Sequence, residues 1–440
     1  MNRVNHAPRE GWQTRVESQG LTYHTHAGPP FHQDGVMQRP ASDVPRPYWC
    51  ETAHYELSVA EVDRLEAAAD AVHSLCLQVI PQTLDKAWIM GRLGLPEHAV
   101  PLLRASWERQ EPSFYGRFDF GYDPSHDPHP KLYEYNADTP TGLVEAAVAQ
   151  WFWLEDHYGG IDRDPKALGH DQFNGLHEAL IERWRRIGRR GSDVHFAGLL
   201  HVPEDAQNLV YLADTAQQAD LKPHLLDIRE VGWNAGAGEF RDREDRPLRT
   251  LFKLYPWEDL FREPFAAHLT GAGTRWVEPA WKILLGNKAI LTLLWELFPG
   301  HPNLLPAAFE PERLPQSAQR AYVRKPNFGR EGQNVQVCEG NRTVATLAGG
   351  YGDDGFVCQA RFQQRGFAAP DQPEEGDALV RPVFGVWMVG DKSCGLGIRE
   401  EAGPITSNRS RFVPHCFTSL EPSDDGASGG LLGPKGAPDR

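Results

Sequence analysis

Hydrophobic and polar positions recur with two different periods along the chain, which predicts a protein built from both helices and strands. Apolar residues return every three to four positions over 58–78 and 143–156, as on the buried face of an amphipathic helix. Residues 193–202 form an apolar run typical of a buried strand, and 208–228 continue as a helix, a short turn and a second strand. A β-α-β unit of this kind indicates an α/β or α+β fold, and no internal repeat of fixed period is visible.

The second half of the chain has the pattern of a helix followed by short strands. Residues 286–300 read as an amphipathic helix, with a glycine before it and Pro-Gly after it. The runs NVQVCEG, GFVCQARFQ and ALVRPVFGVWMVG alternate polar and apolar residues between glycine turns, which predicts an antiparallel sheet of short strands. The fold class predicted from the whole pattern is therefore α+β.

Both ends of the chain lack the pattern of a packed element. Residues 1–45 are polar and rich in His, Pro and Gly, so we expect an extended arm there. The segment 418–440 offers almost nothing to bury and is expected to be a disordered tail. One folded region over 46–417 remains, with an α/β subdomain at 193–250.

Composition narrows the class of protein. The chain has 440 residues, 40% of them hydrophobic, and contains no apolar run of about 18 residues. Its first 15 residues lack the apolar run of a secretory signal. We therefore expect a cytoplasmic protein with a substantial core and no membrane partner. The net charge of −15 argues against a nucleic-acid partner and suits a small cationic one. The six scattered cysteines are expected to be buried, reduced thiols.

The segment GRFDFGYDPSHDPHPKLYEYNADTPTG predicts a hairpin with two chemically different faces. Side chains alternate faces in a strand, so Arg117 and Asp119 share one face, as do Glu134 and Asn136 in the returning strand. The proline-rich turn between 121 and 130 can reverse the chain. The four polar side chains then converge on one side of the hairpin. The other side carries Phe118, Phe120, Tyr133 and Tyr135.

The polar face of this hairpin has the composition of a metal site. Two carboxylates and an amide oxygen are the hard ligands that Mg²⁺ takes when it also binds substrate phosphates. Asp119, Glu134 and Asn136 are therefore candidate magnesium ligands. Arg117 beside them can hold phosphate or carboxylate oxygens through its planar guanidinium. The alternative that periodicity leaves open is a solvated hairpin whose charges pair with one another.

The residues after the hairpin combine hydroxyl side chains with the start of a helix. Asp138, Thr139 and Thr141 precede the apolar-periodic stretch LVEAAVAQWFWLEDHY, and either threonine is a candidate N-cap. Free amides at a helix start attract anions, so a substrate carboxylate can dock there. Ordinary capping without a ligand is the open alternative.

Two lysines flank a glycine loop in the second half of the chain. Lys288 starts the predicted helix, and Lys325 ends a strand just before the loop NFGREGQN. Gly329 and Gly332 allow backbone conformations in which successive amides point at an anion. The loop has neither the Walker A order nor a Rossmann GxGxxG. Because lysines are mostly exposed, two unrelated surface charges are the alternative to a nucleotide-phosphate site.

Two further segments supply candidate ligands for a nucleotide. In FVCQARF, Gln359 and the backbone of Ala360 to Phe362 can read an adenine edge through hydrogen bonds. In GLGIREE, Arg399 lies at a predicted strand end and can stabilise a phosphoryl group or a tetrahedral intermediate. The alternative for Arg399 is a surface pair with one of the two glutamates that follow it.

Six motifs, taken in chain order, resemble those of a known family. RFDFGYD, LYEYNADTPTG, EPAWKILLGNKAIL, YVRKPNFGREG, VCQARFQ and GLGIREE are similar to the synthetase domain of glutathionylspermidine synthase and its stand-alone relatives. The resemblance spans roughly 46 to 416. It implies an ATP-grasp fold with antiparallel sheets flanking the nucleotide site, an α/β pre-ATP-grasp-like region and an ATP-binding lid region at 280–362. It also implies that ATP and Mg²⁺ are used to join a peptide or amino-acid carboxylate to an amine through an acyl phosphate.

The resemblance implies a role for each candidate residue. The magnesium ligands correspond to Asp119, Glu134 and Asn136, and the arginine beside the transferred phosphate to Arg117. The ATP-phosphate lysines correspond to Lys288 and Lys325, next to Gly329 and Gly332. The adenine hinge corresponds to Gln359, Ala360 and Phe362. The arginine of a loop that closes over the intermediate corresponds to Arg399.

The substrate positions match the family only in part. Glu204 and Asp205 fall where the family has a Glu-Glu pair for spermidine, and the shorter Asp leaves the amine open, a polyamine among the candidates. Thr139 and Thr141 replace two serines, and Gly142 stands where the family has a cysteine near the thiol of glutathione. The peptide is therefore open as well. Fewer than 50 residues precede the resemblance, so no amidase activity is expected.

Two other functions remain open from the sequence. A non-catalytic nucleotide-binding regulatory protein would keep the pocket without ligation, but the complete polar face of the hairpin argues against it. A carboxylate kinase would release the acyl phosphate to another enzyme. An ATP- and Mg²⁺-dependent acid–amine ligase is the leading hypothesis.

Overall fold

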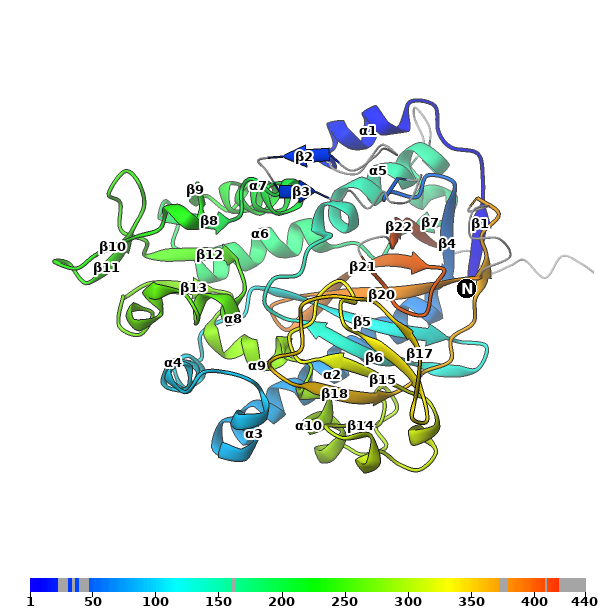
Figure 1. Cartoon of the computed structure of the whole chain (residues 1–440). Helices are drawn as coiled ribbons and strands as arrows, with labels where there is room; N and C mark the ends of the chain where they lie inside the picture. The colour runs from blue at the N-terminus through cyan, green and yellow to red at the C-terminus, as the bar shows by residue number, and fades with distance from the viewer. Residues whose placement is uncertain are drawn as a thin grey trace, which may run out of the picture.

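The computed structural model mixes helices with several β-sheets, in agreement with the predicted combination (Figure 1). It describes residues 1–22, 31–33, 36–38, 47–159, 164–371, 379–407 and 410–418. Apart from Thr418, the predicted tail at 418–440 lies outside these residues. Among the helices within them, none has the length and apolar content needed to cross a bilayer.

An antiparallel sheet near the centre of the molecule contains the predicted hairpin (Figure 1). In spatial order its strands are β22 (Arg411–Val413), β21 (Lys392–Glu401), β20 (Leu379–Val389), β5 (Tyr115–Asp123) and β6 (Asp127–Asn136), and β19 (Phe367–Ala368) pairs with β20. Arg117 is opposite Asn136, and Asp119 is opposite Glu134, so the four polar side chains are cross-strand neighbours. The hairpin is confirmed, with a tighter turn than expected, over 124–126.

The apolar side of this sheet is covered by α2 (Val59–Asp85), which confirms and lengthens the helix predicted over 58–78. The helix begins at a capping box, in which Ser58 and Glu61 each accept a hydrogen bond from the other's amide. Its buried stripe packs against β6, β20 and α10 (Ile290–Leu297), in one hydrophobic core with Phe118. The polar side of the hairpin is therefore the side left for a ligand.

The short strands predicted after residue 300 form a second antiparallel sheet. Its order is β14 (Ala307–Ala308), β18 (Phe356–Ala360), β15 (Tyr322–Pro326), β16 (Gln336–Glu339) and β17 (Arg342–Thr346). The glycine loop joins β15 to β16. The helix predicted over 286–300 is confirmed only over α10, and a separate short helix, α9 (Ile283–Gly286), precedes it. Asn287 lies between the two helices, where its side chain accepts from the amide of Ala289.

A parallel sheet contains the predicted β-α-β unit. Its order is β13 (Arg275–Val277), β12 (Thr250–Leu254), β8 (Asp193–Gly198) and β9 (Lys222–Asp227), and α7 (Pro203–Gln218) connects β8 to β9 with α6 (Leu176–Ile187) packed on it. A small hairpin of β10 (Gly232–Asn234) and β11 (Glu239–Arg241) follows β9. The α/β region therefore extends past the predicted boundary at 250, because β12 and β13 complete its sheet.

The first residues of the chain are part of the fold, which corrects the predicted extended arm. β1 (Asn2–Asn5) pairs with β4 (Ala53–Ser58), in a sheet that also contains β23 (His415–Thr418) and β7 (His170–Asp171). α1 (Trp12–Ser18) follows, and β2 (Phe31–Gln33) pairs with β3 (Val36–Gln38). Arg3 is buried because it forms ion pairs with Glu400 at 2.8 Å and Asp371 at 3.0 Å. The sequence did not predict these ion pairs, because both partners of Arg3 lie far from it along the chain.

The remaining α-helices in the described residues lie in the connections between strands. They are α3 (Ala87–Arg92), α4 (Val100–Glu108), α5 (Gln150–Leu154) and α8 (Trp257–Leu260). α5 lies between two π-helical turns, η2 (Glu145–Ala149) and η3 (Glu155–Gly159), so the helix predicted over 143–156 is confirmed. The six cysteines are unpaired, and all except Cys394 are buried, as expected.

Candidate active site

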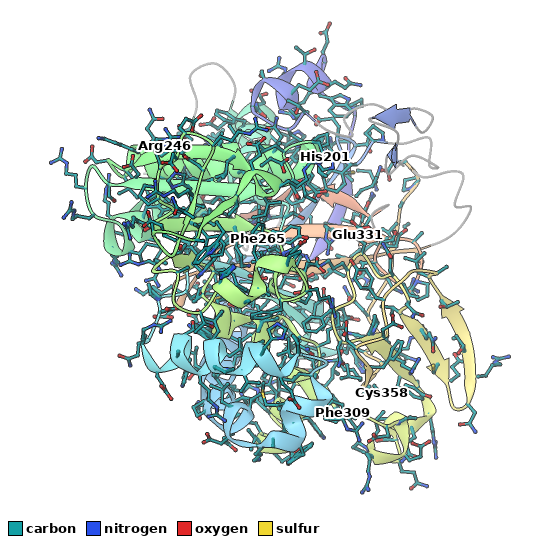
Figure 2. The ribbon with its side chains drawn as sticks, turned by 60° about the vertical axis from the view of Figure 1, so that its left-hand side comes forward. His201, Arg246, Phe265, Phe309, Glu331 and Cys358 are labelled. Carbon is teal, nitrogen blue, oxygen red and sulfur yellow. The ribbon has the colours of Figure 1, made fainter. Side chains whose placement is uncertain are left out.

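A cavity of about 730 Å³ opens between the central sheet, the five-stranded sheet, the glycine loop and the start of α7. Its volume lies in the range of small-molecule sites. In the view of Figure 2, Glu331 of the glycine loop lies between the region of the parallel sheet, marked by His201, and the five-stranded sheet, marked by Cys358. The cavity is lined by every candidate site residue of the sequence: Arg117, Asp119, Glu134, Asn136, Thr139, Thr141, Glu204, Asp205, Lys288, Lys325, Gly329, Gly332, Gln359, Ala360, Phe362 and Arg399.

Asp119 is the centre of the polar cluster on the hairpin. It is 3% exposed, and Arg117 donates to both of its oxygens, over 2.6 and 3.1 Å. Asn136 donates to Asp119 at 3.2 Å and to Glu134 at 3.3 Å, so it bridges the other two candidate metal ligands. The charges do pair with one another, but inside a cavity rather than on a solvated face. Oxygen-bearing side chains held this closely fit a hard divalent cation such as Mg²⁺.

A β-bulge turns one aromatic side chain toward the polar face, which corrects its predicted orientation. The pairing register shifts after Asp119 and leaves Tyr133 as the extra residue. Tyr133 lines the cavity, and its ring centre lies 5.5 Å from the ammonium of Lys325. Tyr135 keeps the predicted side and stacks on Phe118 at 3.8 Å. The predicted alternation of faces therefore fails at Tyr133 and holds at Tyr135.

Both candidate phosphate lysines are buried, at 8% exposed, which excludes the alternative of surface charges. Lys288 Nζ lies 3.0 Å from Glu134 Oε2 and donates to the carbonyl of Gly329 at 2.6 Å. Burial alone would raise the pKa of Glu134, but the ammonium groups of Lys288 and Lys325 outweigh it and lower the pKa to about 2. Burial, together with the charge of Lys288, lowers the pKa of Lys325 to about 8. The lysines thus form a buried cationic site with one carboxylate between them.

The side chain of Gln359, predicted to contact an adenine, is hydrogen-bonded to a lysine and to a backbone carbonyl. Its Oε1 accepts from Lys325 at 2.7 Å, and its Nε2 donates to the carbonyl of Leu132 at 2.9 Å. The amide of Ala360 also donates to a neighbouring carbonyl at 2.7 Å. Gln359, Ala360 and Phe362 all line the cavity.

The glycine loop carries an arginine that the sequence did not single out. Arg330 donates to the hydroxyl of Thr139 and pairs with Glu258, each at 2.8 Å. Gly332 has a φ of +69°, and a Cβ at this position would collide with the carbonyl oxygen of Thr406. The loop is therefore fixed both to the segment after the hairpin and to the segment after β21.

The threonines after the hairpin are engaged differently from the predicted N-cap. The hydroxyl of Thr139 accepts from Arg330, and the first helix amide, of Leu143, is bonded by Asn208 at 3.3 Å. Thr139 and Thr141 both line the cavity. Their position beside the polar cluster, and not a role in capping, makes them candidate substrate contacts.

Glu204 and Asp205 form an acidic pair at the start of α7, on the cavity wall. Burial and the neighbouring carboxylate of Glu204 raise the pKa of Asp205 to about 7, against the opposing charge of Arg330. A carboxyl group that titrates near neutrality in a cleft is common where a cation binds or a proton is transferred. The pair is therefore suited to an amine.

Arg399 projects from β21 toward the polar cluster. Its Nη2 lies 3.3 Å from Asp119 Oδ2, and its side chain is 28% exposed. The alternative of an ion pair between Arg399 and Glu400 is wrong, because Glu400 pairs with Arg3 and Arg411. Two guanidinium groups, of Arg399 and Arg117, thus flank one carboxylate.

Sequence reasoning missed residues that act at a distance along the chain. The charge of Arg330 between two glycines of NFGREG was an available signal, but its partners were not. Lys253 pairs with Asp138 at 2.5 Å across 115 positions of sequence, both buried, and so fixes the segment that carries the threonines. Local patterns contain no information on such a pair.

The chain is similar to known proteins over most of its length. The family model described as "Glutathionylspermidine synthase preATP-grasp" matches residues 3–418. A Haemophilus influenzae protein named "Putative acid--amine ligase" is 41% identical over 387 residues, which cover 86% of this chain and 93% of that protein. Trypanothione synthetase of Crithidia fasciculata is 28% identical over 378 residues, 80% of this chain and 54% of that protein.

A bifunctional glutathionylspermidine synthetase/amidase of Escherichia coli is 27% identical over 322 residues, 68% of this chain and 50% of that protein. The chain thus spans about half the length of these last two relatives. A glutathione synthetase-like effector from Globodera pallida has a similar fold, with a TM-score of 0.53 at 10% identity, over 92% of this chain and 96% of that one.

The relatives are ligases and synthetases by name, and the chain is an enzyme of the carbon–nitrogen ligase class. It belongs to the glutathionylspermidine synthase family.

Proposed function

We propose that this chain is an ATP- and Mg²⁺-dependent acid–amine ligase with an ATP-grasp architecture. It joins a peptide or amino-acid carboxylate to an amine, a polyamine among the candidates. The observation that carries this proposal is that oxygen donors on the hairpin and two buried lysines line one cavity. Transfer of a phosphoryl group depends mainly on positioning and on neutralising charge, which this combination can supply.

The reaction we propose has two displacement steps. A carboxylate oxygen of the acid attacks the γ-phosphorus of ATP, and ADP leaves. The amine nitrogen then attacks the acyl carbon and loses a proton, and phosphate leaves. Arg117 and Arg399, both in contact with Asp119, offset negative charge that develops on the phosphoryl oxygens. Mg²⁺ held by Asp119, Glu134 and Asn136 would supply further neutralisation of the phosphates.

The two substrates are assigned to opposite chemical features of the cavity lining. Arg330 and the threonine hydroxyls suit the carboxylate of the acid, because a guanidinium can bind it through two hydrogen bonds. Glu204 and Asp205 suit the cationic amine. A substrate with several ammonium groups would gain most from this acidic pair.

The proposal is tested by measuring ADP release with a panel of acids and amines, and by searching the products for a mass equal to acid plus amine minus water. Asp119→Asn is expected to lower turnover by about 10²-fold or more, because it removes a charge that organises both arginines. The matched control is Asp127→Asn, a carboxylate of the same hairpin that pairs with Lys131 at the surface. Unchanged turnover in Asp119→Asn would remove the metal and phosphoryl assignment.

Hydroxylamine separates ligation from the release of an acyl phosphate. A ligase shows ADP release that depends on the amine and a product that contains it. ADP release and hydroxamate formation without any dependence on amine would instead identify a carboxylate kinase.

A further inference from the structure

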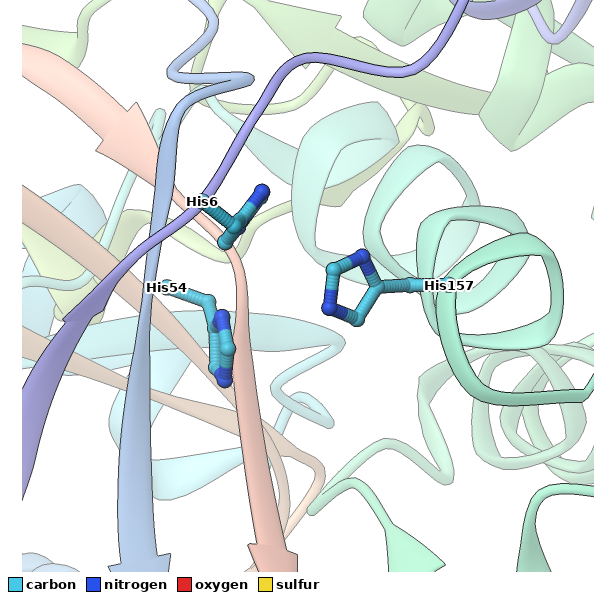
Figure 3. A group of neighbouring side chains, drawn as sticks. All are labelled: His6, His54 and His157. Carbon is cyan, nitrogen blue, oxygen red and sulfur yellow. The ribbon is translucent and has the colours of Figure 1, made fainter.

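Three histidines from separate segments gather outside the cavity (Figure 3). His6 follows β1, His54 lies in the adjacent β4, and the ring of His157 projects from η3 toward the other two. One nitrogen of each ring lies within 4.8 Å of those of the others, and the ring centres are 4.5 to 5.5 Å apart. None of the three is part of the cavity lining described above.

We propose that His6, His54 and His157 form a binding site for a divalent transition-metal ion of the zinc class. The site is separate from the proposed magnesium ligands and does not depend on the proposed function. Its three nitrogen donors suit Zn²⁺, Ni²⁺ or Cu²⁺, whereas Mg²⁺ and Ca²⁺ prefer oxygen.

The hydrogen bonds of two rings leave one nitrogen of each for a ligand. His6 Nδ1 lies 3.1 Å from the carbonyl of Ala7, to which it can donate, and His6 Nε2 is buried without a partner. His54 is 1% exposed, its Nε2 lies 2.9 Å from the hydroxyl of Tyr158, and its Nδ1 is buried without a partner. Buried polar atoms are rarely left unsatisfied, and a metal ion would satisfy both.

The surroundings of the cluster match those of a metal-binding histidine. The hydroxyl of Tyr158 also donates to Glu56 at 3.5 Å, so a chain of hydrogen bonds behind His54 can fix its ring and its tautomer. Burial, assisted by the neighbouring histidines, lowers the pKa of His54 to about 3 and that of His157 to about 4. The rings of His54 and His157 are therefore neutral at physiological pH, the form that binds metal.

Only small side-chain movements separate this arrangement from coordination. Zn–N distances of about 2.0–2.1 Å place tetrahedral ligand atoms roughly 3.3 Å apart, so the nitrogens must each move by less than about 1 Å. His6 and His157 are both partly exposed and can make this movement. A bound ion would leave a fourth position for water and would connect the N-terminal segment to β4 and η3.

Packing of neutral rings is the competing explanation for the cluster, because Trp153 stacks on His157 with ring centres 4.8 Å apart.

A zinc titration distinguishes the two explanations. Wild type, His6→Gln and His157→Gln, each as the whole chain, are first freed of metal with a chelator. Each protein is then titrated with Zn²⁺ in competition with a chromophoric chelator. His170→Gln is the matched control, since His170 stacks on Tyr158 at the edge of the same cluster but is not one of the three.

We expect one zinc ion per wild-type chain and no change in the control. Loss of a partner behind a metal ligand typically costs about 10- to 100-fold in affinity, so removal of a ligand in each of the two variants should weaken binding by at least about 100-fold. Zinc X-ray absorption of the wild type is expected to show three imidazole ligands, and zinc is expected to raise the melting temperature of the wild type but not of His157→Gln. Circular dichroism checks that the variants fold. Absence of a retained ion, equal affinity in wild type and both variants, or an all-oxygen coordination shell would overturn the proposal.

Discussion

Glu134 is the carboxylate that offsets the positive charges of two buried lysines, Lys288 and Lys325. Its Oε2 lies 3.0 Å from Lys288 Nζ, and the charge of Lys325 acts on it as well. Glu134→Gln keeps the shape of the side chain but removes its charge. The two ammonium groups then repel each other without the carboxylate that offsets their charge.

The size of the effect follows from the pKa of the carboxyl group. The ammonium groups lower that pKa from 4.5 to about 2, which at about 1.4 kcal/mol for each tenfold change corresponds to about 3 kcal/mol of folding free energy. Removing one member of a buried ion pair typically costs about 3–5 kcal/mol, which is consistent. Because the pKa of the folded state is depressed, this stabilisation is present above pH 4.5 and is lost as the pH falls through about 2. Measurements at pH 6 therefore capture the full effect.

The assay is urea unfolding at pH 6, followed by tryptophan fluorescence and circular dichroism, for wild type, Glu134→Gln and Asp127→Asn. Asp127 pairs with one lysine, Lys131, at 2.8 Å in the same strand, whereas two ammonium groups act on Glu134, so the loss of Asp127 should cost less than about 1 kcal/mol. A Glu134→Gln loss no larger than that of the control would refute the charge balance described here. The double variant Glu134→Gln/Lys288→Met should recover about 1–3 kcal/mol relative to the sum of the single changes, and strict additivity would refute the pairing.

Three further predictions concern the cavity wall. In the wild type, the KM of the amine should fall as the pH rises through about 7, because the Asp205 carboxyl ionises there and only the ionised form attracts a cation. Asp205→Asn should abolish this pH dependence. Initial rates between pH 6 and 8 measure it, and a wild-type KM that is flat over that range would contradict the prediction. Arg330→Met should raise the KM of the acid about 10-fold. It should also destabilise the fold by about 1–3 kcal/mol, because Glu258 is left buried without this partner. Kinetics equal to those of the wild type would exclude a contact between Arg330 and the acid. Gly332→Ala should raise the KM of ATP, and it should lower the melting temperature more than the control Gly340→Ala does. Both glycines have a positive φ, but of the two only Gly332 has a carbonyl oxygen in the space that a Cβ would occupy. A larger effect at Gly340 would show that backbone strain dominates.

The elements of the fold and the polar face of the hairpin follow from local sequence. A period of two assigns Arg117, Asp119, Glu134 and Asn136 to one side wherever two strands pair in register, and a turn of few residues sets that register. The β-α-β unit and α2 are equally local, since the spacing of apolar residues decides which surface each presents to the core. These features could be predicted because the interacting residues are close in the chain.

Contacts between distant segments were decided by the tertiary structure. A bulge reversed Tyr133, Gln359 became the support of Lys325, and Arg3 was buried by acidic residues near the other end of the chain. The cluster of His6, His54 and His157 likewise has no counterpart in any spacing along the sequence. Local patterns establish which face a side chain takes within its own strand or helix. Which other residues meet it there depends on how the elements pack, because burial and charge pairing act through space and not along the chain.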